Sequence, residues 1–103
     1  MLEKLKEDIK QYEEVIDIYS NLNTTDIELA YDLAIKSLLL ADTWNEIMLN
    51  CTDLKTELSM SKTSLEKWSY HKYRILMTIH EFCRVVWRQG KEESRNSFIG
   101  GEY

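Results

Sequence analysis

The chain has 103 residues, carries a net charge of −5 and contains no proline. A chain of this length forms at most one domain with a small core, because it buries only about two-thirds of the surface that it exposes when unfolded. No apolar run approaches the roughly 20 residues of a membrane span, and the acidic N-terminus does not resemble a signal peptide. We therefore expect a soluble, cytoplasmic protein without membrane contact.

The spacing of apolar residues predicts an all-α fold that begins with a helix over residues 2–22. Residues 2–19 carry apolar side chains alternately three and four positions apart, which is a heptad pattern held for about two and a half repeats. A short helix of this kind gains its stability from what it packs against, so we expect a homo-oligomer or a protein partner. The predicted oligomer interface consists of this seam and of aromatic residues further along: Leu2, Leu5, Ile9, Tyr12, Ile16, Tyr19, Trp68, Phe82 and Trp87.

A capping-box pattern predicts that a second helix begins near Thr25-Asp26-Ile27-Glu28, with the Thr25 hydroxyl as the cap. Small residues at helical spacing in its first half would allow a neighbouring helix to approach closely; they are Ala30, Ala34, Ser37 and Ala41. If this helix continues to a turn at residues 59–62, it is about 35 residues and roughly 50 Å long. A break at residues 50–53 is the alternative, and it would give a compact four-helix bundle.

A second capping box, Thr63-Ser64-Leu65-Glu66, predicts a third helix from Leu65 to about Arg88 with a broad aromatic face. The chain after Gln89-Gly90 is polar and contains two further glycines. We therefore place a single helical domain at residues 1–95 and a flexible tail at residues 96–103. The predicted fold is a short heptad helix followed by a long antiparallel helical hairpin, or a compact helical bundle.

Charge is unevenly distributed along the chain. Residues 1–54 hold twelve acids and four bases, whereas residues 55–95 hold five acids and nine bases. Attraction between an acidic and a basic helix explains this distribution, and a nucleic-acid surface is the alternative. The candidate nucleic-acid-binding residues are cations interleaved with aromatic residues that can stack on unpaired bases: Lys62, Lys67, Lys72, Arg74, Arg84, Arg88, Lys91 and Arg95. Because these positions differ in helical phase, a continuous basic surface would require several subunits.

The sequence contains no pattern typical of a metal site or a common catalytic site. His80 and Cys83 lie one helical turn apart, and Cys51 could lie across the hairpin, but structural zinc usually has four ligands in closely spaced pairs. No glycine-rich phosphate loop, Ser/His/Asp set or paired-carboxylate site is present. We expect no metal, no cofactor, no small-molecule substrate and no enzymatic activity, and we expect both cysteines to be reduced core thiols.

Arg74 and His80, with five residues between them, are similar in spacing to the catalytic pair of the HEPN ribonuclease family, which is all-helical and often dimeric. The resemblance implies that both residues meet their symmetry mates across a dimer, with the imidazole for proton transfer and the guanidinium for phosphate binding. That family usually has a polar residue after the arginine, whereas this chain has Ile75.

A second resemblance covers residues 30–95. Tyr31-Asp32-Leu33-Ala34, Asp42-Thr43-Trp44 and Phe82-Cys83, followed by a basic, polar C-terminus, resemble the phage recombination-mediator (UvsY-like) proteins. This resemblance implies a non-enzymatic phage or mobile-element accessory protein in the host cytoplasm, which oligomerises, binds single-stranded DNA and helps to load a recombinase. The alternatives are an acidic, protein-directed inhibitor or adaptor of anti-defence type, bound to a host nucleic-acid enzyme, and a HEPN-like ribonuclease.

Overall fold

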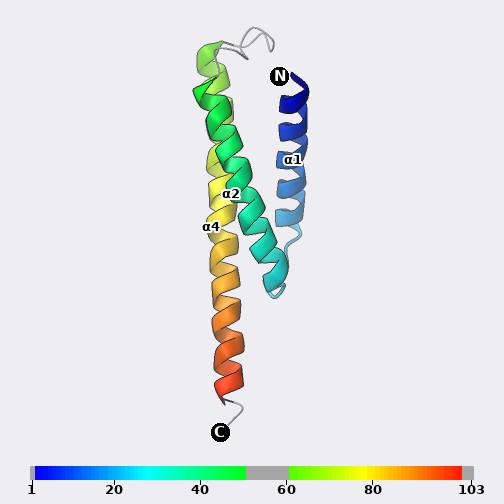
Figure 1. Ribbon diagram of the computed structural model, residues 1–103, viewed down its shortest axis with the longest axis vertical. Coiled ribbons are helices and arrows are strands. Elements are labelled where there is room, and N and C mark those ends of the chain that lie inside the picture. The colour runs from blue at the N-terminus through cyan, green and yellow to red at the C-terminus, as the bar shows by residue number, and fades with distance from the viewer. Residues whose placement is uncertain (1, 51–60, 101–103) are drawn as a thin grey trace.

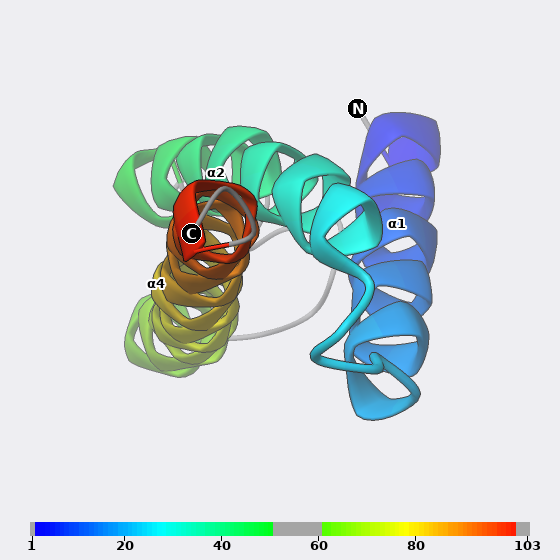
Figure 2. The same ribbon diagram turned by 90° about the horizontal axis from the view of Figure 1, so that it is seen from below.

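The computed structural model describes residues 2–50 and 61–100, with the side chains of all of these except Leu2, Lys62 and residues 94–100. The described residues form three helices and no strand: α1 (Leu2–Ser20), α2 (Ile27–Leu49) and α4 (Lys62–Gly100). α2 and α4 pack together as an antiparallel hairpin, and α1 lies along one side of it (Figures 1 and 2). The prediction of an all-helical bundle is confirmed, and none of the described helices is both long and apolar enough to span a membrane.

The first predicted helix cap is wrong by one residue. Asp26, not Thr25, caps α2, because its carboxylate accepts a hydrogen bond from the backbone N–H of Leu29 at 3.1 Å. The Thr25 hydroxyl donates instead to the side chain of Asn23 at 2.8 Å. The Thr25 hydroxyl, which the capping-box pattern assigned to the cap, is therefore engaged in the turn with Asn23. The carboxylate of Asp26 caps the helix instead.

The start of α4 also differs from the prediction. The Ser61 hydroxyl accepts a hydrogen bond from the backbone N–H of Ser64 at 3.1 Å, so that the helix begins at Lys62, three residues before the predicted start at Leu65. A serine-rich stretch offers several possible caps, and a sequence pattern does not distinguish between them.

The prediction of one continuous second helix is wrong, because α2 ends at Leu49. The backbone N–H and the side-chain amide of Asn50 both donate to the carbonyl oxygen of Glu46, at 2.9 and 3.0 Å. A side-chain amide that competes for a helical carbonyl favours the end of a helix. The alternative break at Asn50 is thus confirmed, whereas the fourth helix that it implied falls on residues 51–60, outside the described residues.

The predicted end of the third helix at Arg88 is wrong, because α4 continues to Gly100. Gly90 does not mark a turn; it lies inside the helix where α4 meets the start of α2. A Cβ atom at Gly90 would overlap Ile27 Cγ2 and lie 3.2 Å from Ile27 Cβ, so that only glycine allows this approach. The backbone of residues 96–100 is helical, and the flexibility of the predicted tail over residues 96–103 stays a prediction.

The core lies between α2 and α4 and extends to α1. The four small residues predicted to admit a close neighbour are all buried in α2, and this prediction is confirmed: Ala30, Ala34, Ser37 and Ala41. In α1, Leu5 and Val15 are buried. Four further seam residues are half-buried against the same core: Ile9, Tyr12, Ile16 and Tyr19. The heptad seam therefore contacts this chain's own hairpin. The side chain of Leu2 is not among those that the structure describes.

Candidate nucleic-acid interface

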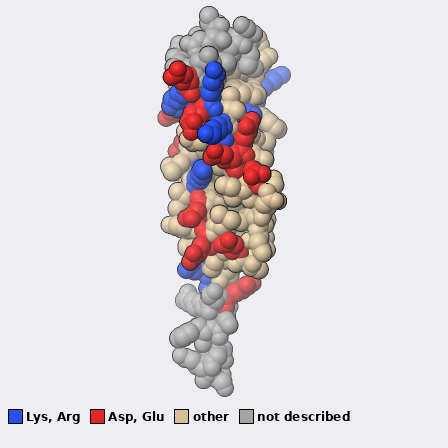
Figure 3. Space-filling model, turned by 90° about the vertical axis from the view of Figure 1, so that its right-hand side faces the viewer, with Lys and Arg blue, Asp and Glu red and all other residues tan. Residues whose placement is uncertain are grey.

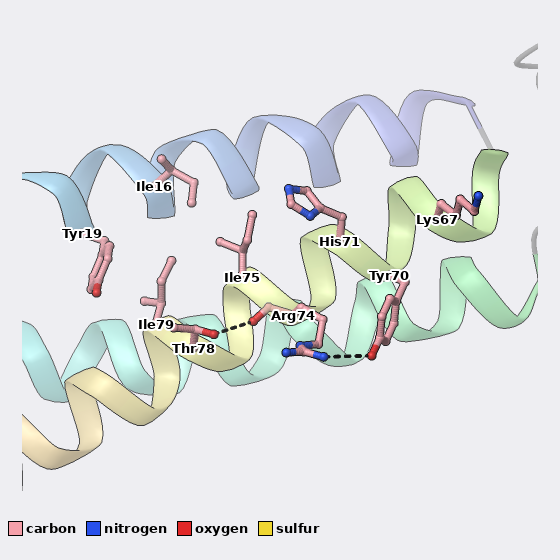
Figure 4. A pocket seen from close by; sticks show the side chains of 9 residues that line it. All are labelled: Ile16, Tyr19, Lys67, Tyr70, His71, Arg74, Ile75, Thr78 and Ile79. Carbon is pink, nitrogen blue, oxygen red and sulfur yellow. Dashed lines mark hydrogen bonds between the residues drawn. The ribbon is translucent and has the colours of Figure 1, made fainter.

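A groove of about 560 Å³ runs between α1 and α4 (Figure 4). α1 contributes two apolar or aromatic side chains, and α4 contributes the rest. The lining residues are Ile16, Tyr19, Lys67, Tyr70, His71, Arg74, Ile75, Thr78 and Ile79. No aspartate or glutamate is among these lining residues, although the chain as a whole is acidic.

The polar side of the groove is a stripe of nitrogen-bearing side chains on α4. Lys67, His71 and Arg74 are four and three residues apart, and this spacing places them on one face of the helix. All three are exposed. An anion bound here would meet two permanent positive charges and an imidazole, with no described carboxylate in the lining to repel it.

Tyr70 forms an aromatic platform beside this stripe. One guanidinium nitrogen of Arg74 donates to the Tyr70 hydroxyl at 3.1 Å, and the guanidinium carbon lies 5.8 Å from the ring centre. This hydrogen bond is the main reason why the pKa of Arg74 is raised above its ordinary value. The ring also stacks on Tyr73 at 6.3 Å and is 45% exposed, so that a flat ring is held in the open beside a positive charge.

Lys72 points into a different environment, where the three helices meet. Its ammonium lies 4.4 Å from the ring centre of Tyr12 (α1), 5.7 Å from that of Trp44 (α2) and 5.1 Å from that of Trp68 (α4). Burial lowers the pKa of Lys72, and the negative charge of Glu13 partly opposes this effect. We call Tyr12, Trp44, Trp68 and the lysine that they surround, Lys72, the aromatic cluster. The positive charge of Lys72 therefore lies against aromatic rings of its own chain.

The other predicted cations lie apart from the groove. Arg84 forms an ion pair with Glu81 at 2.9 Å, while Arg88 and Lys91 are exposed further along α4. The side chains of Lys62 and Arg95 are not among those that the structure describes. Of the eight predicted nucleic-acid-binding residues, the groove therefore brings together Lys67 and Arg74.

The aromatic residues of the predicted oligomer interface each contact another ring of the same chain. Trp68 packs edge-on against Trp44 with the ring centres 5.1 Å apart. Phe82 contacts Tyr19 at 5.6 Å and remains 42% exposed, and Trp87 contacts Tyr31 at 5.3 Å. Self-association through these residues stays a prediction.

Arg74 and His80, the candidate ribonuclease pair, lie in separate environments within one chain. Nδ1 of His80 is 2.7 Å from the carbonyl oxygen of Ala34 and donates to it, which fixes the ring against α2. Arg74 lines the groove, with its guanidinium turned toward Tyr70 (Figure 4). Among the described residues, no group of three or more His, Cys, Asp or Glu side chains is placed to hold a metal ion, and Cys51 lies outside them.

Cys83 is fully buried in α4, and burial raises the pKa of its thiol. Because the raised pKa makes the folded thiol keep its proton at a pH where the unfolded thiol ionises, the stability that comes from the neutral thiol is complete below the ordinary thiol pKa and falls as the pH rises through the folded pKa. We expect the unfolding free energy of a Cys83→Ala variant to fall less than that of the wild type as the pH rises from neutral into the alkaline range. Urea denaturation at several pH values under reducing conditions measures this difference, and parallel pH profiles would contradict it.

Acidic and basic side chains are interspersed on the face that α1 covers (Figure 3). Between α1 and α2, the Lys36 ammonium lies 3.9 Å from the Glu14 carboxylate, and both side chains are about half exposed. The other described ion pairs, Lys4–Asp8 and Arg84–Glu81, lie within single helices. Among the described residues, therefore, no ion pair joins an acid of residues 1–54 to a base of α4, and the hairpin is held mainly by apolar packing.

Sequence reasoning missed the groove as a unit. Its residues come from two helices, and the packing of α1 against α4 was not predicted. His71 carries the signal that could have indicated it, because it lies four residues after Lys67 and three before Arg74. Comparison of the chain with protein-family models, curated proteins and solved structures finds no match.

Proposed function

We propose that the groove between α1 and α4 binds single-stranded nucleic acid, and that the protein acts without catalysis as an accessory factor of the recombination-mediator type. The observation that supports this proposal best is that Lys67, His71 and Arg74 line the same groove as the exposed ring of Tyr70, with no acidic residue in the lining. Lysine and arginine neutralise phosphates, and an exposed tyrosine stacks on an unpaired base.

The number of charges in the groove determines how strong such binding can be. Two permanent cations release few counterions, so the logarithm of the affinity is expected to fall with the logarithm of salt concentration with a slope of about −1.4. Binding of this kind is weak for one subunit and becomes useful when several subunits contact one strand. The recombinase-loading role rests on the UvsY-like resemblance.

The test is the binding of a fluorescently labelled oligothymidylate, measured by anisotropy at several salt concentrations. We expect Lys67→Ala/Arg74→Ala to weaken binding by about tenfold or more at low salt and to bring the salt slope close to zero. The matched control is Lys6→Ala/Lys10→Ala, which removes two exposed lysines from α1 outside the groove and should leave the slope unchanged.

Two outcomes would contradict the proposal. One is a wild-type protein that shows no binding at low salt, which would favour the protein-directed inhibitor or adaptor. The other is an equal loss of binding in the groove variant and in the α1 control, which would mean that binding follows overall charge and not the groove.

A further inference from the structure

We propose that two copies of this chain associate through the side of the α2–α4 hairpin that faces away from α1. This side carries a cluster of apolar residues that we call the hairpin face. Its members are Tyr31, Ile35 and Leu38 of α2 and Tyr73, Met77 and Trp87 of α4. The three residues of α2 are 45%, 43% and 39% exposed, which is unusual for large apolar side chains at helical spacing.

Two contacts between α2 and α4 lie along the hairpin face. The rings of Tyr31 and Trp87 are 5.3 Å apart, and His80 donates to the backbone of Ala34 one helical turn away. These contacts fix the antiparallel alignment of α2 and α4. Positions three and four residues further along each helix, Leu38 and Met77 among them, then continue the same stripe.

α1 packs on the opposite side of the hairpin. The Lys36–Glu14 ion pair marks that side of α2, and the groove marks that side of α4. Seen along the helices, α1 lies on one side of the hairpin and no described helix covers the other (Figure 2). The hairpin face is therefore without a neighbour in the described part of the chain.

Charge complementarity indicates that the occupant is a second copy. Along α2, the hairpin face is flanked by exposed acids that form no ion pair with described residues: Glu28, Asp42 and Glu46. Along α4, it is flanked by the bases Arg88 and Lys91, and by Arg84, which pairs with Glu81 of its own helix. An acidic edge and a basic edge on one face are self-complementary when two such faces meet in a suitable orientation.

The charges also select the symmetry. A two-fold axis parallel to the helices places α2 of one copy over α4 of the other at the same height, so that Glu28 comes opposite Arg88 and Lys91 of the second copy. A two-fold axis perpendicular to the helices, in the plane of the interface, would place α2 of one copy over α2 of the other. It would bring acids opposite acids and is therefore disfavoured. The favoured arrangement is a bundle of four antiparallel helices.

The test compares two adjacent leucines of α2 by sedimentation equilibrium of the full chain over a wide concentration range. Leu38 belongs to the hairpin face, whereas Leu39 is 64% exposed and points about 100° away around the helix. We expect the wild type to approach twice its 12.3 kDa chain mass at high concentration. Leu38→Glu should weaken the dimer by about a hundredfold or more, and Leu39→Glu should leave it unchanged.

A charge exchange tests the orientation. Glu28→Lys should weaken the dimer, and Glu28→Lys combined with Arg88→Glu should restore part of the lost affinity. Circular dichroism of each variant checks that the helices are retained, and if Leu38→Glu fails to fold, Leu38→Ala replaces it. A wild type of monomer mass at every concentration overturns the proposal, as does a dimer that Ile9→Glu in α1 disrupts and Leu38→Glu does not.

Discussion

Replacement of Trp44 by alanine is expected to lower the free energy of unfolding by about 3–5 kcal/mol. The indole is fully buried in α2 and contacts Trp68 of α4 at 5.1 Å and Tyr12 of α1 at 6.2 Å, measured between ring centres. Removing it leaves a cavity at the only described point where aromatic rings from all three helices meet. It also removes one of the rings that Lys72 faces.

Urea denaturation followed by far-UV circular dichroism measures this loss. Leu39→Ala is the matched control, because Leu39 lies on the same helix and is 64% exposed, and its replacement should change stability by less than about 0.5 kcal/mol. If Trp44→Ala does not fold, Trp44→Phe keeps one ring and should show a smaller loss. A Trp44→Ala variant as stable as the control would mean that the cluster contributes nothing to the fold.

Replacement of Gly90 by alanine is expected to destabilise the protein by about 1–2 kcal/mol, although alanine is the better helix former by about 1 kcal/mol. The new Cβ atom would overlap Ile27 Cγ2 and lie 3.2 Å from Ile27 Cβ. Because isoleucine branches at Cβ, its side chain has few rotamers with which to move away. Helix propensity and packing therefore act in opposite directions at this position, and packing prevails.

A double-mutant cycle tests the cause of this effect. Combining Gly90→Ala with Ile27→Ala removes the overlapping methyl group, so the double variant should be more stable than the sum of the two single effects by about 1 kcal/mol or more. Gln89→Ala is the control, because it changes the exposed neighbouring residue without touching Ile27. A Gly90→Ala variant more stable than the wild type would show that α4 shifts freely at this contact.

The sequence predicted the helices well because periodicity is a local property. The small residues of α2 are buried as their spacing indicated, and α2 ends at Leu49, in agreement with one of the two alternatives. The seam of α1 was predicted as an oligomer interface, and its described residues are buried or half-buried against this chain's own hairpin. The helix ends were less predictable. Caps at Asp26 and Ser61 depend on which of several adjacent side chains reaches the backbone, and Gly90 serves a contact with a residue more than sixty positions away.

The candidate site was predictable only in part, because it depends on which helix α1 lies against. Lys67 and Arg74 were among the predicted cations, but the same list contained Lys72, whose charge faces the aromatic cluster, and Arg84, which pairs with Glu81. A cation in the sequence carries no information about these neighbours until the helices are packed. His71 and the groove itself became visible only in the assembled bundle.

The aromatic cluster gives the protein an internal optical reporter. The protein has three tryptophans, and two of them, Trp44 and Trp68, belong to this cluster and pack against each other. Trp44 also contacts the Tyr12 ring of α1, with the ring centres 6.2 Å apart. If α1 leaves the hairpin while α2 and α4 stay helical, Trp44 loses this ring and its indole becomes hydrated. Tryptophan fluorescence emission therefore reports whether α1 is packed against the hairpin, independently of the helix content that circular dichroism measures.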